Sequence, residues 1–312
     1  MHATSAFLGR LGETLRLWVD ADAPPIQPGT DPDAVQWGRV LPFAALHLAC
    51  LGVIWVGWSP TAGLIALATY LVRMFALTAF YHRYFSHRTF RTSRLVQFLG
   101  ALIGNAAAQR GPLWWAAHHR HHHRNADTDA DVHSPKEHSF AWSHMGWFTA
   151  PRNFPTDYAI VADLARYPEL RFLNRFDAVA PLALALALFG LGELLAYTHP
   201  ELGTNGLQLV VWGFFVSTVL LFHVTCMINS VAHRFGHRSY ATRDESRNSM
   251  LVALLTMGEG WHNNHHHYSG SVRQGFRWWE IDVTYYALVA LSWLGIVRDL
   301  RPVPARVLAE AR

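Results

Sequence analysis

The sequence contains few cysteines and few charged residues, and both shortages narrow the class of protein. Only two cysteines, Cys50 and Cys226, occur among 312 residues, and both lie in apolar stretches. They exclude a disulfide framework and match no cysteine-based zinc or iron–sulfur pattern, so we expect buried, inert thiols. Charged residues make up 15% of the chain and hydrophobic residues 51%. This balance argues against an ordinary soluble domain, in which about 25% of residues are charged.

Residues 1–20 lack the continuous apolar core of a secretory signal peptide. Apolar residues instead recur at helical spacing, with Arg10 and Arg16 between them. This pattern predicts an amphipathic helix that lies on a membrane surface. A linker containing proline and aspartate follows, and no internal repeat or low-complexity segment appears farther along the chain.

The hydrophobic residues gather in four blocks that predict transmembrane helices, at about 41–58, 61–81, 178–198 and 207–230. Each block approaches the roughly 20 residues that cross a hydrocarbon core about 30 Å thick. A fifth apolar stretch, 283–297, is shorter and contains Tyr285, Tyr286 and Trp293. We therefore expect a packed or interfacial helix there.

The basic residues predict the orientation of these spans. Of 26 Lys and Arg residues, 3 precede the first block, 12 lie in 82–177 and 10 follow the fourth block, whereas the links 59–60 and 199–206 contain none. The positive-inside rule then places both termini and the 82–177 segment in the cytoplasm. We expect an all-α integral membrane protein with four spans and a cytoplasmic helical cap. Its parts are an N-terminal helix and linker (1–39), the main domain (40–304, with the cap at 82–177 and 231–304) and a tail (305–312).

Histidines cluster at the predicted cytoplasmic ends of the helices. In WWAAHHRHHHR (114–124), His122 and His123 lie about −60° and +40° from His119 on a helix, so the three share a face while diverging to opposite sides of it. The same spacing recurs at His262, His265 and His266. Two matching triplets predict two helices that face each other across metal, and one helix can supply ligands to two adjacent ions.

Two further segments add candidate ligands. His82 and His87 in YHRYFSHR would be about 140° apart on a continuous helix, so they converge only if the helix ends between them. His233 lies one turn after Asn229, and His237 is a geometric competitor, although Gly236 favours an earlier helix end. The acidic stretch DTDADVHSP (127–135) reads as an irregular polar loop.

Nine imidazoles exceed the coordination sphere of one ion, so the sequence implies two. Structural zinc usually takes thiolate ligands, which this chain does not offer. Imidazole suits zinc, copper, iron and nickel, and the ligand type alone leaves the choice of metal open.

Four histidine-containing phrases, HRYFSH, HRHHH, HNNHH and NSVAH, resemble the histidine boxes of the integral-membrane fatty-acid desaturases. The chain is most similar to the acyl-CoA Δ9 (stearoyl-CoA) branch in its short bacterial form, and the phrases GEGWHNNHHHY and RQGFRWWEID are specific to this match. The resemblance implies four membrane helices under a cytoplasmic cap, with a di-iron centre between them. It assigns one iron to His82, His87, His119, His123 and His266, and the other to His122, His233, His262 and His265, with Asn229 contributing through a water.

The resemblance also implies a narrow substrate tunnel. Gln109, Trp115 and Thr225 would line and bend it, and its floor would lie near Ala66 and Tyr70. The chain departs from animal members just before the first histidine of the triplet, where it has Ala117 and His118 in place of an Arg-Asp pair. This departure leaves acyl-CoA, acyl carrier protein and phospholipid open as carriers of the acyl chain.

These features together predict an O2-dependent acyl desaturase of the bacterial inner membrane that introduces a cis, Δ9 double bond. We expect two non-haem irons, O2 as co-substrate, and electrons from a separate ferredoxin, rubredoxin or cytochrome b5-like protein. The arginine-rich face suits an acidic donor, and we expect no nucleic-acid partner. The alternatives are a di-iron fatty-acid or alkane hydroxylase with similar histidine boxes and, from another class, a histidine-rich metal transporter or store.

Overall fold

The computed structural model describes residues 12–23 and 31–311. Four helical segments are long and apolar enough to cross a membrane, as predicted, and the second continues five residues beyond its expected end. Residues 12–19 of the predicted N-terminal helix are helical, and 1–11 lie outside the described part. The four segments are α2–η1–α3 (Trp37–Ala49, Cys50–Gly52, Val53–Val56), α4–η2 (Pro60–Phe75, Ala76–Ser86), α9 (Val179–Thr198) and α10–η7–α11 (Gly206–Val210, Val211–Val216, Ser217–Ser230).

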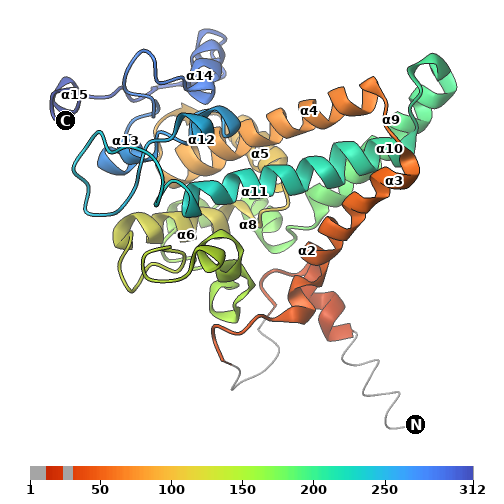
Figure 1. The fold of residues 1–312 in the computed structure, drawn as a ribbon, viewed down its shortest axis with the longest axis horizontal. Coiled ribbons are helices and arrows are strands. Elements are labelled where there is room, and N and C mark those ends of the chain that lie inside the picture. Colours follow the sequence, from red (N-terminus) through yellow and green to blue (C-terminus); the bar gives the residue numbers. More distant parts are fainter. Residues whose placement is uncertain (1–11, 24–30, 312) are drawn as a thin grey trace.

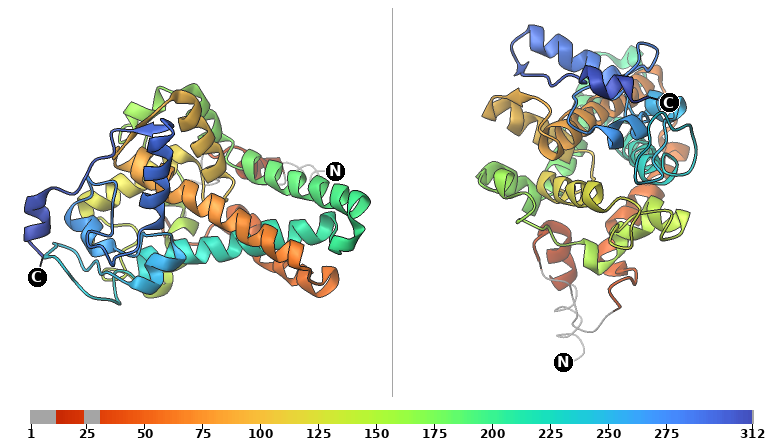
Figure 2. Two further views of the ribbon diagram at one scale, coloured as in Figure 1. Left: turned by 90° about the horizontal axis from the view of Figure 1, so that it is seen from above. Right: turned by 90° about the vertical axis from the view of Figure 1, so that its left-hand side faces the viewer.

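Most of the shorter elements gather towards one end of these helices, whereas α3, α10 and the end of α9, with the short η6 (Pro200–Leu202) that follows it, mark the opposite end (Figures 1 and 2). Among the described residues, the expected all-α fold is interrupted by a two-residue strand pair, β1 (Arg91–Thr92) with β2 (Val297–Arg298), and by isolated bridges that link Asn248 to His237 and to Trp261. The short helices are α5 (Arg94–Asn105), α6 (Pro112–Asn125), η3 (Trp142–Gly146), η4 (Trp147–Thr149), η5 (Pro151–Asn153), η6 (Pro200–Leu202), α7 (Ala162–Ala165), α8 (Pro168–Arg175), α12 (Met250–Leu255), α13 (His262–His267), α14 (Val283–Trp293) and α15 (Ala305–Ala309).

The outer faces of the long helices are apolar. Ile54, Leu64 and Leu186 have 72%, 67% and 72% of their surface exposed. Large apolar side chains at such exposure suit a lipid environment, because water would disfavour a continuous apolar face of this kind. The 11-residue α14 is too short to span a bilayer, as predicted.

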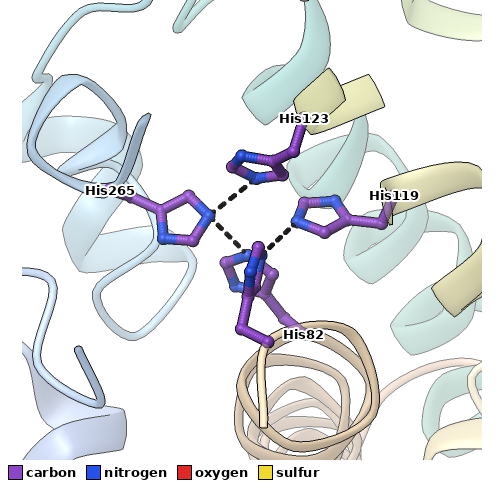
Figure 3. A group of neighbouring side chains, drawn as sticks. His82, His119, His123 and His265 are labelled. Carbon is purple, nitrogen blue, oxygen red and sulfur yellow. Dashed lines mark hydrogen bonds between the residues drawn. The ribbon is translucent and has the colours of Figure 1, made fainter. Parts of the chain in front are cut away.

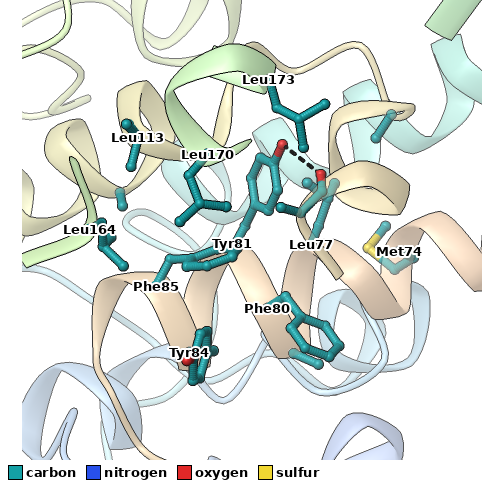
Figure 4. Close-up of a cluster of buried hydrophobic side chains, with 14 of the residues drawn as sticks. Met74, Leu77, Phe80, Tyr81, Tyr84, Phe85, Leu113, Leu164, Leu170 and Leu173 are labelled. Atoms are coloured by element: carbon teal, nitrogen blue, oxygen red, sulfur yellow. Dashed lines mark hydrogen bonds between the residues drawn. The ribbon is translucent and has the colours of Figure 1, made fainter. Parts of the chain in front are cut away.

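The largest buried cluster surrounds η2. Its aromatic side chains, including Tyr81 and Phe85, pack against leucines of α6, α7 and α8 (Figure 4). On the other side, α5 approaches closely because Gly100 and Gly104 lack side chains: a Cβ at these positions would overlap the rings of Phe80 and Tyr81 respectively. This packing fixes η2, which carries the first histidine of the site.

Candidate metal centre

The hydrogen-bond pattern of η2 brings the first two histidines together. α4 changes at Ala76 into a π-helix, in which residues five apart are linked. The N–H of His87 accordingly donates to the carbonyl of His82 (3.3 Å), and their ring centroids lie 4.9 Å apart. The helix does end before His87, at Ser86. The π geometry, which the sequence did not indicate, explains why the two rings converge.

The triplets on α6 and α13 face each other and contribute to two clusters. His119 and His123 of α6 join the first cluster and His122 joins the second, as the helical angles predicted. α6 begins at Pro112, whose fixed φ suits a first helical position. His233 is the residue of its segment that enters the site, three residues after the end of α11.

His265 and His266 occupy the opposite clusters from those that the family resemblance assigned. His265 joins the first cluster and His266 the second. The two side chains leave α13 on opposite sides of His262, so the helical angles separate them without deciding which ion each serves. The orientation of α13 decides it, because its His265 side faces His82 on η2, with Nε2 atoms 3.0 Å apart.

The first cluster contains five imidazoles from three segments. His265 of α13 points towards His123 of α6 and towards His82 (Figure 3). The Nε2 atoms of His123 and His265 lie 2.9 Å apart, and those of His87 and His119 lie 2.8 Å apart. Two nitrogens bound at right angles to one ion at about 2.1 Å would be about 3.0 Å apart. The spacing of His82, His87, His119, His123 and His265 therefore suits one ion.

The second cluster contains four imidazoles, of which three belong to buried residues and that of His266 to a partly buried one. The Nε2 atoms of His233 and His262 are 3.0 Å apart, and those of His122 and His266 are 3.4 Å apart. One candidate ligand atom from each of His122, His233, His262 and His266 lies within 4.8 Å of the others.

Four buried carboxylates fix the orientation of the rings, and the sequence analysis did not identify any of them. Each accepts a hydrogen bond from the Nδ1–H group of one histidine, which leaves the Nε2 of that ring free to bind metal. A carboxylate in this role both holds the ring and increases its basicity. The pairs are His82–Glu259 (2.5 Å), His122–Asp131 (3.0 Å), His233–Asp127 (2.9 Å) and His266–Asp244 (2.8 Å).

The contact between the Nε2 atoms of His122 and His266 indicates whether a metal cation fits this centre. Both rings donate from Nδ1 to an aspartate, so in their neutral forms neither has a proton on Nε2. Two nitrogen lone pairs would then face each other at 3.4 Å without a hydrogen between them. A metal cation between these atoms removes the repulsion, and the donor set therefore fits a histidine-bound transition metal.

The electrostatics agree with this interpretation. Burial and the neighbouring histidines lower the pKa of His119, His123 and His262 well below the usual value, so these rings are neutral at pH 7. Burial alone would raise the pKa of Asp127, but hydrogen bonds from His233 and Ser134 hold it well below its usual range. For Glu259, His82 and Arg83 likewise outweigh burial and lower the pKa to about 2. Neutral ligands surrounded by ionised carboxylates favour bound cations.

Three of the four missed carboxylates, all except Asp244, lie close to the histidine motifs in sequence. Asp127 and Asp131 are in the stretch that we read as a polar loop, within eight residues of His123. Glu259 lies in GEGWH, three residues before His262. The available signal for these carboxylates was the presence of acidic residues next to the histidine motifs in a chain that has few charged residues. Their pairing with rings from distant segments was not predictable, since His233 and Asp127 are 106 residues apart.

Arg83 links this outer layer to the C-terminal part of the chain. Its buried guanidinium contacts Glu259 (3.0 Å) and Asp282 (2.9 Å) and donates to the carbonyl of Val272 (2.8 Å). We predict that Arg83→Met destabilises the protein by about 3–5 kcal/mol, because two buried carboxylates lose their counter-charge. Thermal unfolding of the purified protein in detergent would measure this loss.

Arg91→Met is the matched control, since the ion pair of Arg91 with Asp299 is exposed and 3.5 Å long. It should change stability by at most about 1 kcal/mol. Equal unfolding temperatures for the two variants would contradict the role assigned to Arg83.

Comparison with known proteins identifies the family. The family model for fatty acid desaturases matches residues 36–293. The chain belongs to the fatty acid desaturase family. It is similar to an acyl-CoA 5-desaturase of Anemone leveillei (36% identity, covering 86% of this chain and 80% of the relative). It is also similar to an sn-1 stearoyl-lipid 9-desaturase of Anabaena variabilis (35%, covering 86% and 94%) and an sn-2 palmitoyl-lipid 9-desaturase of Nostoc (35%, covering 85% and 90%).

In this desaturase, the histidine clusters adjoin a largely apolar cavity of about 200 Å³. His82, His119, His122 and His262 line it together with side chains of α2, η2, α6 and α11. The expected tunnel residues Gln109, Trp115 and Thr225 also line it. Trp115 stacks on His119 with a centroid separation of 5.0 Å, and Gln109 Nε2 donates to Thr225 Oγ1 (3.0 Å).

The predicted floor at Ala66 and Tyr70 is wrong for this cavity. On the second span, the lining of the cavity begins at Met74. Tyr70 does not border the cavity, because its hydroxyl donates to the carbonyl of Leu255 at the end of α12 (2.7 Å). Phe43, Ala108 and Phe222 line both this cavity and a second, small void, and we call these three side chains the inner wall.

Asn229 lines the same cavity as His122 and His262. Its carbonyl accepts a hydrogen bond from Ser143 (3.1 Å). Ligation by Asn229 through a water stays a prediction. The sequence indicated no role for His133. The centroid of its ring lies 4.4 Å from that of His122, and the residue also lines the cavity.

Proposed function

We propose that this desaturase uses a pair of histidine-bound iron ions, O2 and external electrons to introduce a cis double bond into a saturated acyl chain. The Δ9 position is our proposal for the site of that bond, since two of the similar cyanobacterial proteins are named 9-desaturases. The reaction removes two hydrogen atoms from neighbouring CH2 groups. With two electrons and two protons, these hydrogens reduce one O2 to two waters.

One observation carries the proposal: the imidazoles of both clusters border the same apolar cavity. His82 and His119 belong to the first cluster, and His122 and His262 belong to the second. All four line the cavity, whose other lining residues include Met74, Leu77 and Phe222. An alkyl chain in this space would pass beside both clusters. When bound there, a pair of irons supplies the redox chemistry that an unactivated CH2 group demands and that acid–base residues cannot provide.

The residues of the chain provide position and a dry environment. Trp115 and the apolar side chains of α2, η2 and α11 exclude water from the cavity. The Gln109–Thr225 hydrogen bond joins the loop before α6 to α11, and both side chains line the cavity, where we propose that they form a constriction. We infer that this constriction bends the substrate and determines which carbons lie beside the clusters. The CH2 groups of an acyl chain carry no polar group that could select one position, so regioselectivity depends on the shape of the cavity.

Orientation and electron supply complete the proposal. The arginine distribution supports cytoplasmic termini and a cytoplasmic cap, in a bacterial inner membrane. The proposed electron donor is a separate, acidic ferredoxin, rubredoxin or cytochrome b5-like protein, which the arginine-rich face of the chain would attract. Purified protein supplied with substrate should turn over faster with such a carrier than with a chemical reductant alone.

The decisive experiment expresses the chain in a host that lacks its own desaturase and analyses fatty-acid methyl esters by gas chromatography. We expect a new monounsaturated acid, with the double bond located by chemical derivatisation. A hydroxy acid instead would identify a hydroxylase, and an unchanged profile under electron-donor co-expression would contradict the proposal.

The inner wall gives a prediction about chain length. Phe43, Ala108 and Phe222 also border a second, small void that reaches His47 and Thr218. Phe222→Val should join the two spaces, because removal of the ring opens the wall between them. We expect the ratio of C20 to C18 products to rise several-fold in assays with both substrates.

The matched control is Phe189→Val, which removes a ring from α9 that is 41% exposed and does not line the cavity. Its product ratio should equal that of the wild type. If Phe222→Val leaves the ratio unchanged while folding normally, the inner wall lies elsewhere.

A further inference from the structure

The segment that follows α11 leaves an apolar surface uncovered. In α12, Met250, Leu251 and Leu254 are 49%, 64% and 52% exposed, whereas Val252 is buried. Residues 249–258 contain no charged side chain. Water disfavours a continuous apolar face of this kind, so we expect α12 to lie against an apolar partner.

Tyr70 fixes the depth at which α12 lies. Its hydroxyl donates to the carbonyl of Leu255, the last residue of α12 (2.7 Å), and α12 also packs against α11 (Figure 1). Tyr70 belongs to the 27-residue membrane span Pro60–Ser86. Any stretch of about 20 residues within this span, the length that crosses a hydrocarbon core, includes Tyr70. The end of α12 therefore reaches the depth of the hydrocarbon core.

The exposed face of α12 continues the lipid-facing side of α4. Leu67, one turn before Tyr70, and Leu71, directly after it, are 54% and 41% exposed. On a helix these two leucines lie about 60° and 100° from Tyr70, on the same side of it. Leu255 is itself 38% exposed. The contact of Tyr70 with Leu255 therefore places the two exposed apolar faces beside each other.

The start of α14 and the loop before it extend this surface. The N–H of Thr284 donates to the carbonyl of Met257, just after α12 (2.8 Å). Trp278 in the loop and Trp293 at the end of α14 are 83% and 82% exposed, and residues 283–297 contain no charged side chain. Tryptophan is enriched where a membrane protein passes from the hydrocarbon core to the lipid headgroups. The exposure of both tryptophans suits that boundary.

We propose that α12, the loop Trp278–Ile281 and α14 form an apolar shelf that is immersed in the membrane leaflet on the side of the histidine clusters. The lipid bilayer is the partner of this shelf, because lipid surrounds the span at the depth that Tyr70 sets. The segment 231–304, which the sequence predicted as part of the cap, is then partly a membrane element. α13 lies between α12 and the loop in sequence. Lipid contacts on both sides of α13 thus help to fix the orientation that assigns His265 and His266 to their clusters.

Quenching of a fluorescent label tests the shelf directly. The full-length protein with Cys50→Ala and Cys226→Ala receives a single new cysteine, by Leu254→Cys, Trp278→Cys or Trp293→Cys. Each variant is labelled with bimane and placed in phosphatidylcholine nanodiscs. We expect phosphatidylcholine brominated on its acyl chains to quench each label more strongly than aqueous iodide does, and several-fold more strongly at Leu254, because the end of α12 reaches the hydrocarbon core.

Two labels elsewhere on the chain supply the references. Leu64→Cys reports on lipid, since Leu64 is 67% exposed on α4, and Ala309→Cys reports on water, since Ala309 is exposed on α15 beside Glu310. The shelf labels should behave like the Leu64 label. Quenching by iodide as strong as at Ala309 would overturn the inference. Protection from both quenchers would also overturn it, because a protein contact would then cover the shelf in place of lipid.

A variant of Tyr70 tests the depth of α12. Tyr70→Phe leaves the carbonyl of Leu255 without its donor at a depth where lipid offers no other. We therefore expect the end of α12 to move towards water, so that iodide quenches the Leu254 label more strongly while the Leu64 label is unchanged. Tyr197→Phe, at an 87% exposed tyrosine near the end of α9, is the matched control and should change neither label. An unchanged Leu254 label in Tyr70→Phe would contradict the depth assigned to α12.

Discussion

His119→Ala should eliminate the new double bond. His119 lies between His87 (Nε2–Nε2 2.8 Å) and Trp115, and it belongs to the five-histidine cluster. Loss of a residue that hydrogen-bonds a metal ligand typically lowers metal affinity or activity 10–100-fold. Loss of a ligand should cost more than about a hundredfold, and gas chromatography of the host lipids should find no product above background.

His121→Ala is the control for this variant, since it lies on the same helix but belongs to neither cluster. Its ring contacts the carbonyl of Ala130 (2.9 Å) and is partly exposed. We expect product levels close to those of the wild type. Substantial activity in His119→Ala, or equal losses in both variants, would show that the five-histidine cluster is not the catalytic centre.

Asp244→Asn should reduce desaturation and iron retention about 10–100-fold. Asp244 accepts hydrogen bonds from Nδ1–H of His266 (2.8 Å) and from the backbone N–H of Ser246 (2.9 Å). Asparagine keeps the size of the side chain but removes the charge that fixes the imidazole tautomer. Desaturation rate and iron content, measured after dialysis against a weak chelator, would quantify the effect.

The adjacent pair His267–Glu310 supplies a matched control. Glu310 accepts a hydrogen bond from His267 (2.8 Å), but this histidine lies outside both clusters. Glu310→Gln should retain iron and activity within about twofold, since exposed pairs contribute little. If Asp244→Asn behaves like Glu310→Gln, the carboxylate does not support the metal site.

The sequence predicted the parts of this molecule that depend on local periodicity. Apolar blocks of about 20 residues predicted the four long helices, and the angular positions of the residues on α6 placed His122 and His123 on different sides. These properties depend on residues within one helix, so a pattern of spacing is sufficient to recognise them.

The remaining features depend on how separate segments meet. The carboxylate partners come from loops that carry no periodic signal, and the π-helix at η2 gave no indication in the sequence. The orientation of α13 reversed the expected places of His265 and His266. The cavity floor was misplaced for a similar reason, since the hydroxyl of Tyr70 turns to Leu255 and only the packed bundle reveals this.

The metal content of the purified protein tests the central claim most directly. Two histidine clusters on one cavity predict two iron atoms per chain in active preparations, one for each cluster. His119→Ala should retain less iron than the wild type, and His121→Ala should retain the same amount. Fully active wild-type protein that contains zinc, a single iron or no metal would contradict the account.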